Sequence, residues 1–137
     1  MRMTRVWERL FLGGIADAEM LARANPQRIT SVLTLCPHPP RVRAADVEYF
    51  HLPIEDDRPI LGKRLGEILD VMYQNIRRGR LLTHCVAGSS RSPIIIAAWM
   101  QIVGYKNIDE CMSEIARLRP IVDPSPVLLA SVKEQIR

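Results

Sequence analysis

The sequence has few of the features that mark membrane, secreted or metal-bound proteins. It contains no run of 18 or more apolar residues, and its charged N-terminus lacks the apolar centre of a secretory signal, so we expect no membrane span and a cytoplasmic protein. Only three of the 137 residues are cysteines, and their number is odd and their spacing unpaired. We therefore expect reduced thiols, without a disulfide framework or a zinc site.

Aromatic residues are also scarce, at 5% of the chain, and the 19 lysines and arginines are scattered singly or in pairs. Nucleic-acid-binding surfaces combine a basic tract with aromatic side chains that stack on bases, so we expect no nucleic-acid partner. The formal net charge of +4 instead favours an anionic substrate.

The hydrophobic pattern predicts strands and helices in alternation. The expected strands are 5–14, 29–35, 47–54 and 80–85; the expected helices are 17–25, 61–78, one that begins near residue 91, 107–119 and 125–137. Asp17, Asn107 and Ser125 are the expected N-caps. This alternation indicates one α/β domain over residues 1–137, with a central, mostly parallel sheet of four to five strands flanked by helices on both faces.

The stretch "HCVAGSSRS", residues 84–92, lies between a predicted buried strand and a predicted buried helix. Backbone N–H groups in such a loop and at the start of the helix form an anion site. Gly88 allows the backbone to curl, and Arg91 can present a planar fork to two oxygens of one phosphate. The same positive field favours the thiolate of Cys85, which is then a nucleophile directed at phosphorus. We expect a phosphocysteine intermediate that water hydrolyses, with no metal or other cofactor.

This stretch resembles the H-C-x-x-G-x-x-R-[S/T] signature of the cysteine-dependent protein tyrosine phosphatase superfamily, and the small size of the chain matches the dual-specificity branch. The resemblance runs from "LFLGGIADA" to "RLRPIVDPSP". It implies that Cys85 is the nucleophile, Arg91 the phosphate clamp, Ser92 a hydroxyl donor to the cysteine sulfur, and His84 a residue that orders the loop. It also implies a phosphate-binding loop made of Val86, Ala87, Gly88, Ser89, Ser90 and Arg91.

Hydrolysis of a phosphate ester also needs an acid that protonates the departing oxygen. The segment "HLPIEDDRPI" supplies three acidic residues after the third predicted strand, and it resembles the general-acid loop of the same superfamily. That resemblance assigns the role of general acid to Asp56, with Asp57 as the alternative. A solvated acidic turn is the remaining interpretation of this segment.

Cys36 follows the strand "VLTL", which we expect near the strand that carries Cys85. By resemblance to the tumour-suppressor lipid phosphatase and the regenerating-liver phosphatases, Cys36 and Cys85 are a candidate reversible disulfide pair that protects the thiolate. The alternative is that Cys36 is a small buried hydrophobic residue.

The charge of the phosphate-binding loop indicates the class of substrate. Phosphoinositide phosphatases of the superfamily usually carry lysines in the loop, whereas this loop is neutral between its cysteine and its arginine. We therefore expect protein substrates, with hydrolysis of phosphotyrosine and also of phosphoserine or phosphothreonine. Separately, we expect the protein to be a monomer. A phosphoinositide, an RNA 5′-triphosphate end or a small phosphoester remains the first alternative, and a catalytically silent phosphate-binding module the second. Family members often have an asparagine where this chain has Ser125.

Overall fold

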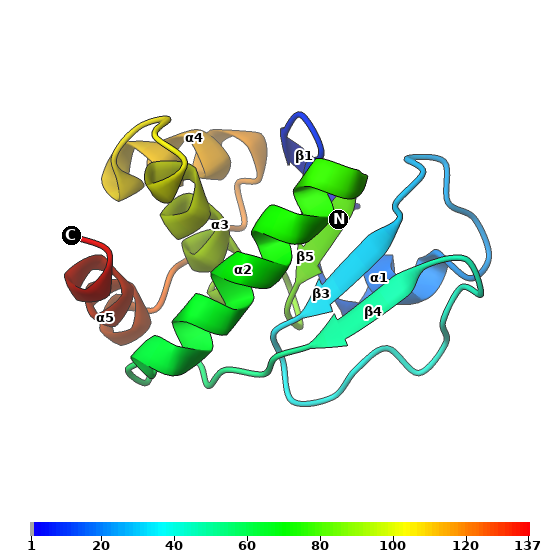
Figure 1. The fold of residues 1–137 in the computed structure, drawn as a ribbon, viewed down its shortest axis with the longest axis horizontal. Helices are drawn as coiled ribbons and strands as arrows, with labels where there is room; N and C mark the ends of the chain where they lie inside the picture. Colours follow the sequence, from blue (N-terminus) through cyan, green and yellow to red (C-terminus); the bar gives the residue numbers. More distant parts are fainter. Residues whose placement is uncertain (1) are drawn as a thin grey trace.

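Five short strands form one sheet whose spatial order differs from their order along the chain (Figure 1). The computed structural model describes residues 2–137, in which the strands are β1 (Thr4–Trp7), β2 (Leu10–Gly13), β3 (Ser31–Thr34), β4 (Glu48–His51) and β5 (Leu81–His84). The order across the sheet is β1-β2-β5-β3-β4. Strand β1 is antiparallel to β2, and the other neighbours are parallel. The predicted α/β architecture with a mostly parallel sheet is thus confirmed.

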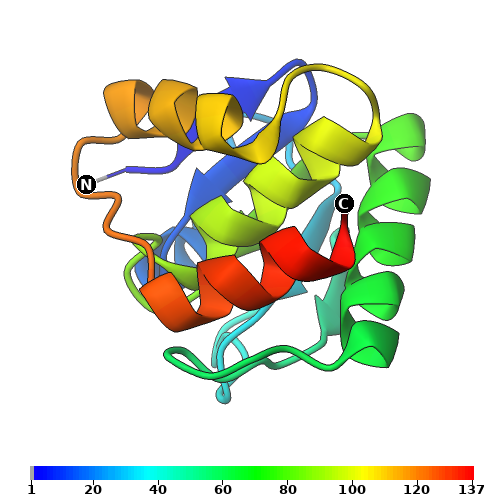
Figure 2. The same cartoon turned by 90° about the vertical axis from the view of Figure 1, so that its left-hand side faces the viewer.

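Helices cover both faces of this sheet, but unequally. They are α1 (Ile15–Met20), α2 (Gly62–Arg78), α3 (Arg91–Ile102), α4 (Ile108–Leu118) and α5 (Pro126–Gln135). Helix α3 packs against β2 and β5 and also contacts α2, α4 and α5, so it is the central helix of the larger layer (Figure 2). The short α1 packs against the opposite face of β2 and β5.

The alternation of side chains along the strands explains the two layers. In β2, Leu10 and Leu12 belong to the large core beneath α2–α5, while Phe11 belongs to the small core beneath α1. Leu81 and Leu82 divide in the same way in β5. Successive residues of a strand point to opposite faces, so a strand covered on both sides is mostly apolar; the polar residues of β5, Thr83 and His84, follow its two leucines.

Two details of the N-terminal region differ from the prediction. The expected single strand 5–14 is a hairpin of β1 and β2, in which the register shifts between Arg5 and Trp7. Helix α1 covers Ile15–Met20 rather than the expected 17–25, so its N-cap is Gly14 rather than Asp17, whose carboxylate accepts a hydrogen bond from the Gly14 N–H at 2.9 Å. Asp17 therefore acts from inside the first turn, where a negative charge also complements the helix dipole.

The C-terminal helices begin where the sequence predicts. The side chain of Asn107 accepts a hydrogen bond from Glu110 N at the start of α4, and that of Ser125 accepts one from Leu128 N at the start of α5. Helix α2 buries Leu65, Ile68 and Met72 and ends at Arg78, with Gly79 as its C-cap. No helix within residues 2–137 has the length and apolarity needed to cross a bilayer.

Candidate active site

Four parallel strands end side by side, and the loops that follow them meet at one edge of the sheet. His84 of β5 pairs with Gly13 of β2 and with Thr34 of β3, which in turn pairs with His51 of β4. In sheets of this kind, ligands bind beyond the carboxyl ends of the strands. The loop 85–90 leaves the centre of this row and leads into α3, so the expected phosphate-binding loop occupies the position where such a site is expected.

Cys85 lies at the base of that loop and is 3% exposed. Its Sγ is 3.1 Å from the Oγ of Ser92, which is fully buried in the first turn of α3. Gly88 has a φ of +70°, and a Cβ there would lie 2.6 Å from the carbonyl oxygen of Gly13. The loop therefore needs glycine at this position both for its left-handed backbone and for its close approach to β2.

His84 links the loop to the neighbouring strand from a fully buried position. Its Nδ1 is 2.9 Å from the carbonyl oxygen of Cys85, and its Nε2 is 2.7 Å from the hydroxyl of Thr34. A carbonyl can only accept, so Nδ1 carries the proton, and in the neutral ring Nε2 accepts from the Thr34 hydroxyl. Burial lowers the pKa of His84, although its hydrogen bond to Cys85 opposes the shift.

This lowered pKa predicts that the protein loses stability in mild acid. The unfolded chain takes up a proton on this histidine below a pH of about 6.5, while the folded chain resists it, so the free energy of unfolding should fall as the pH drops from 7.5 to 5. Urea unfolding at a series of pH values measures this slope. His84→Gln, which does not titrate, should flatten it. Equal slopes for wild type and His84→Gln would contradict the prediction.

The acidic loop after β4 contacts the phosphate-binding loop through Asp56. The hydroxyl of Ser90 donates to Oδ1 of Asp56 at 2.8 Å and accepts from the backbone N–H of Ser125 at 2.9 Å. Because the Ser90 hydroxyl oxygen accepts the Ser125 N–H, its own proton is directed to the Asp56 carboxylate. Arg91 contacts the same acidic loop, since its Nη1 donates to the carbonyl of Ile54 at 3.3 Å.

The structure thus brings Asp56 to the loop and leaves Asp57 outside this network. Asp57 is exposed and has a φ of +57°, a turn conformation that aspartate tolerates better than most residues.

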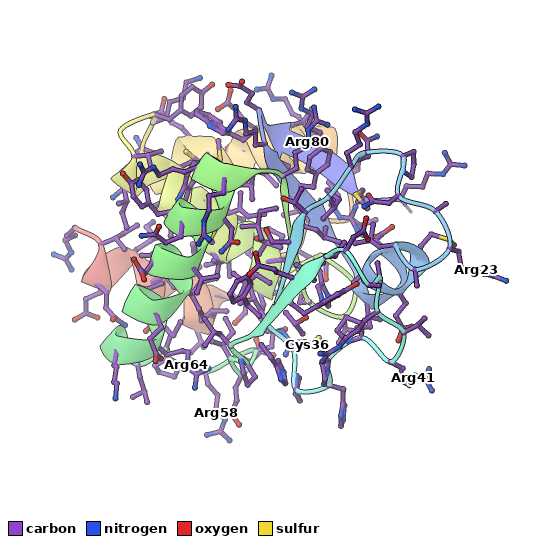
Figure 3. The ribbon with its side chains drawn as sticks, turned by 45° about the vertical axis from the view of Figure 1, so that its right-hand side comes forward. Arg23, Cys36, Arg41, Arg58, Arg64 and Arg80 are labelled. Carbon is purple, nitrogen blue, oxygen red and sulfur yellow. The ribbon has the colours of Figure 1, made fainter. Side chains whose placement is uncertain are left out.

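The guanidinium groups of Arg41 and Arg58 point away from the body of the molecule on either side of Cys36 (Figure 3), and their side chains are 92% and 72% exposed.

Cys36 lies beside the loop but its side chain is 2% exposed. The backbone N–H of Leu35 donates to the carbonyl of His84 at 3.0 Å, so the two chains are still paired just before Cys36 and Cys85. Burial raises the pKa of the Cys36 thiol; the positive charge of Arg91 opposes this shift, and the negative charge of Cys85 adds to it.

A cavity of about 580 Å³ opens next to these residues. It is lined by the proline-rich segment 36–41, by Ile15 and Glu19 of α1, and by Val86 of the loop. Most of this lining is apolar, so the wall beside the phosphate-binding loop suits the apolar part of a substrate.

Two further features brace the loop: Arg119, for which the sequence predicts no role at the site, and the segment 123–125. Arg119 donates to the carbonyl oxygens of Ala87 and Gly88, and the N–H of Asp123 donates to the carbonyl of Ser89 at 2.7 Å. Local sequence gives no signal for these contacts, because they join residues more than 30 positions apart. The sequence points to this segment in two ways: Ser125 is the expected cap of α5, and it stands where family members often have an asparagine.

The family model described as "Dual specificity phosphatase, catalytic domain" matches residues 10–136. Human dual specificity protein phosphatase 15 is 27% identical over 127 residues, which are 91% of this chain and 43% of the relative. Dual specificity protein phosphatase 22-A of Danio rerio is 27% identical over 125 residues, which are 90% of this chain and 60% of the relative. The chain thus spans about half the length of these curated relatives.

Solved structures show the same fold. The crystal structure of DUSP15 superposes with a TM-score of 0.88 at 26% identity, covering 98% of this chain and 87% of that one. A crystal structure of PTPMT1 in complex with PI(5)P superposes with a TM-score of 0.82 at 22% identity, covering 98% of this chain and 94% of that one. At that identity, the second likeness supports the fold alone.

Proposed function

Because this chain belongs to the dual specificity phosphatase family, we propose that it hydrolyses phosphotyrosine, and also phosphoserine and phosphothreonine, in proteins through a phosphocysteine on Cys85. One observation carries the proposal: the fold gathers the thiol of Cys85, the hydroxyl of Ser92 and the carboxyl of Asp56 around one loop. A module that only bound phosphate would need neither the nucleophile nor the acid.

In the proposed first step, the sulfur of Cys85 attacks phosphorus in line with the ester oxygen. The S–P bond forms as the P–O bond to the substrate breaks, and Asp56 transfers its proton to the departing oxygen. Arg91 exchanges its 3.3 Å contact with Ile54 for the phosphate oxygens. The N–H groups of the loop stabilise the charge on the equatorial oxygens.

In the second step, water attacks phosphorus and Asp56, now a carboxylate, accepts its proton. The S–P bond breaks, inorganic phosphate leaves and the thiolate returns. The Ser92 hydroxyl, 3.1 Å from the sulfur, donates a hydrogen bond that stabilises the departing thiolate. This step therefore needs a donor at the sulfur, which the first turn of α3 supplies.

Two features favour proteins over phosphoinositides as substrates. The side chains of the loop between Cys85 and Arg91 carry no charge, so they offer no cation for the additional phosphates of an inositol ring. The adjoining cavity has a largely apolar lining that suits a peptide or an aromatic ring. Phosphoinositides and other phosphoesters remain the alternative substrates for the same chemistry.

A substrate panel tests the proposal. Phosphate release should be fastest from phosphotyrosine peptides, measurable from phosphothreonine and phosphoserine peptides, and slowest from soluble phosphoinositides, with and without a chelator. Faster phosphate release from phosphoinositides than from phosphopeptides would contradict protein substrates and would favour lipid substrates instead. No release from any substrate, together with tight binding of tungstate, would show a silent phosphate-binding module.

We also propose that Cys36 protects Cys85 by forming a reversible disulfide. Peroxide converts the Cys85 thiolate to a sulfenic acid and is reduced to water; the thiolate of Cys36 then attacks that sulfur and hydroxide leaves. The pairing of the two chains up to Leu35 supports this reaction, because it brings Cys36 and Cys85 to the same edge of the sheet. The raised pKa of Cys36 means that it must lose a proton before it attacks.

Peroxide treatment tests this pair. Wild type should yield a Cys36–Cys85 linked peptide by mass spectrometry and should recover most of its activity after reduction. Cys36→Ser should instead accumulate sulfinic and sulfonic acids at Cys85 and stay inactive. Cys111→Ser, which removes a buried thiol from α4, is the matched control and should behave as wild type. Absence of the linked peptide from the wild-type digest would exclude the disulfide.

A further inference from the structure

Arg119 is the largest side chain that the fold buries completely, with 1% of its surface exposed. It follows the last turn of α4, and its guanidinium reaches back to the outer side of the phosphate-binding loop. Nε donates to the carbonyl of Gly88 and Nη2 to the carbonyl of Ala87, both at 3.0 Å. Nη1 donates to the carbonyl of Arg2 at 2.8 Å and to the hydroxyl of Thr4 at 3.1 Å.

These contacts fix the direction of two peptide groups in the loop. A trans peptide is planar, and its N–H points opposite to its C=O. The carbonyls of Ala87 and Gly88 point to Arg119, so the N–H groups of Gly88 and Ser89, which share those peptide planes, point to the opposite side. A charged donor on the carbonyl also polarises the peptide and strengthens its N–H as a donor.

Arg119 carries a positive charge that no carboxylate neutralises by direct contact. None of the ion pairs found in the described part of the chain, residues 2–137, includes it, and all of its hydrogen bonds go to neutral oxygens. Burial lowers the pKa of this guanidinium, while the negative charges of Asp17 and Cys85 oppose the shift. A buried cation without an anionic partner is costly, which favours any anion that binds nearby.

We propose that Arg119 is a positioning residue that holds two N–H groups of the loop toward the phosphate and supplies a buried positive charge behind it. Arg91 approaches the phosphate itself, whereas Arg119 acts through the peptide groups of residues 87–89. This inference rests on the proposed function, since it assumes that a phosphate enters the loop. It assigns a role at the site to a residue outside the signature motif.

Binding of tungstate, a phosphate-like anion, tests the inference without turnover. Arg119→Met should raise the dissociation constant about tenfold or more, because it removes both the charge and the two charge-assisted hydrogen bonds to the loop. Arg119→Lys keeps the charge but cannot span both carbonyls, so its affinity should lie between wild type and Arg119→Met. Arg117→Met is the matched control: Arg117 lies on the same helix with a side chain that is 75% exposed, and its loss should change affinity by no more than about twofold.

The kinetic signature separates Arg119 from the acid. Arg119→Met should lower kcat/KM by similar factors for aryl phosphates with good and poor leaving groups, because the residue acts on the phosphoryl charge and not on the departing oxygen. A loss confined to poor leaving groups, or a folded Arg119→Met with wild-type affinity for tungstate, would overturn the inference.

A measurement on the wild type covers the case in which neither variant folds. The Nε–H of Arg119 should exchange slowly with solvent, and its NMR resonance should shift when tungstate shifts the amide of Gly88, while the Arg117 resonance should not. A Gly88 shift without an Arg119 shift would refute the inference. Failure of tungstate to move the Gly88 amide at all would instead refute the proposed function.

Discussion

Cys85→Ser should lower the turnover of p-nitrophenyl phosphate by about 10⁴-fold or more. The serine hydroxyl takes the place of the thiol with a smaller atom, but it stays protonated at neutral pH and cannot attack phosphorus. The loop itself should remain intact, so the variant should still bind tungstate. The release of p-nitrophenol measures the first effect, and calorimetric titration measures the second.

Cys111→Ser is the control for this substitution. Cys111 is also fully buried, and its Sγ donates to the carbonyl of Lys106 at 3.5 Å, a contact that a serine can reproduce. It should keep its activity near the wild-type value. If Cys85→Ser retained a tenth of the activity, the sulfur would not be the nucleophile and the phosphocysteine would be excluded.

Asp56→Asn should cost about 10²–10⁴-fold in kcat with phenyl phosphate as the substrate. Phenoxide is a poor leaving group, and the amide of asparagine cannot supply the proton that it needs. The loss should shrink for an aryl phosphate whose leaving group is already stable as an anion. A series of substituted aryl phosphates measures this dependence, and a steeper dependence in the variant identifies proton donation.

Asp57→Asn is the matched comparison, since it makes the same chemical change at the adjoining position. Asp57 lies outside the contact between Ser90 and Asp56, so its loss should have little effect on either substrate. If Asp57→Asn were impaired and Asp56→Asn were not, Asp57 would be the general acid. The 2.8 Å hydrogen bond from Ser90 to Asp56 would then belong only to the resting conformation of the loop.

The parts of the structure that the sequence predicts are those set by local chemistry. Asn107 and Ser125 cap their helices because their side chains reach N–H groups three residues on. The turn at 85–90 is predictable because the buried runs on each side define a strand and a helix. The hairpin of β1 and β2 is not: its turn at Glu8 and Arg9 lacks the glycine or asparagine typical of tight hairpins. The side chain of Arg5 instead donates to the carbonyls of Trp7 and Glu8.

The contacts that brace the site depend on distant residues and could not be predicted. From its neighbours in the sequence, Arg119 is predicted only to be one of the cations that favour a helix C-terminus. Its contact with residues 87 and 88 exists because α4 ends beside the loop, which the sequence alone does not place. Ser125 shows the same limit, because its side chain caps α5 as predicted while its backbone N–H holds Ser90.

The central position of β5 constrains how the chain can fold. The first four strands form two separate pairs, β1 with β2 and β3 with β4, and each parallel contact that unites them involves β5. A nascent chain whose residues 81–84 are still inside the ribosome therefore lacks the strand that joins the two pairs. Joining them needs contacts between residues some 50 to 70 positions apart, as in Thr34 with His84 and Leu10 with Leu81. Such non-local pairing slows folding, and it makes the chain most prone to aggregate just before its middle strand arrives.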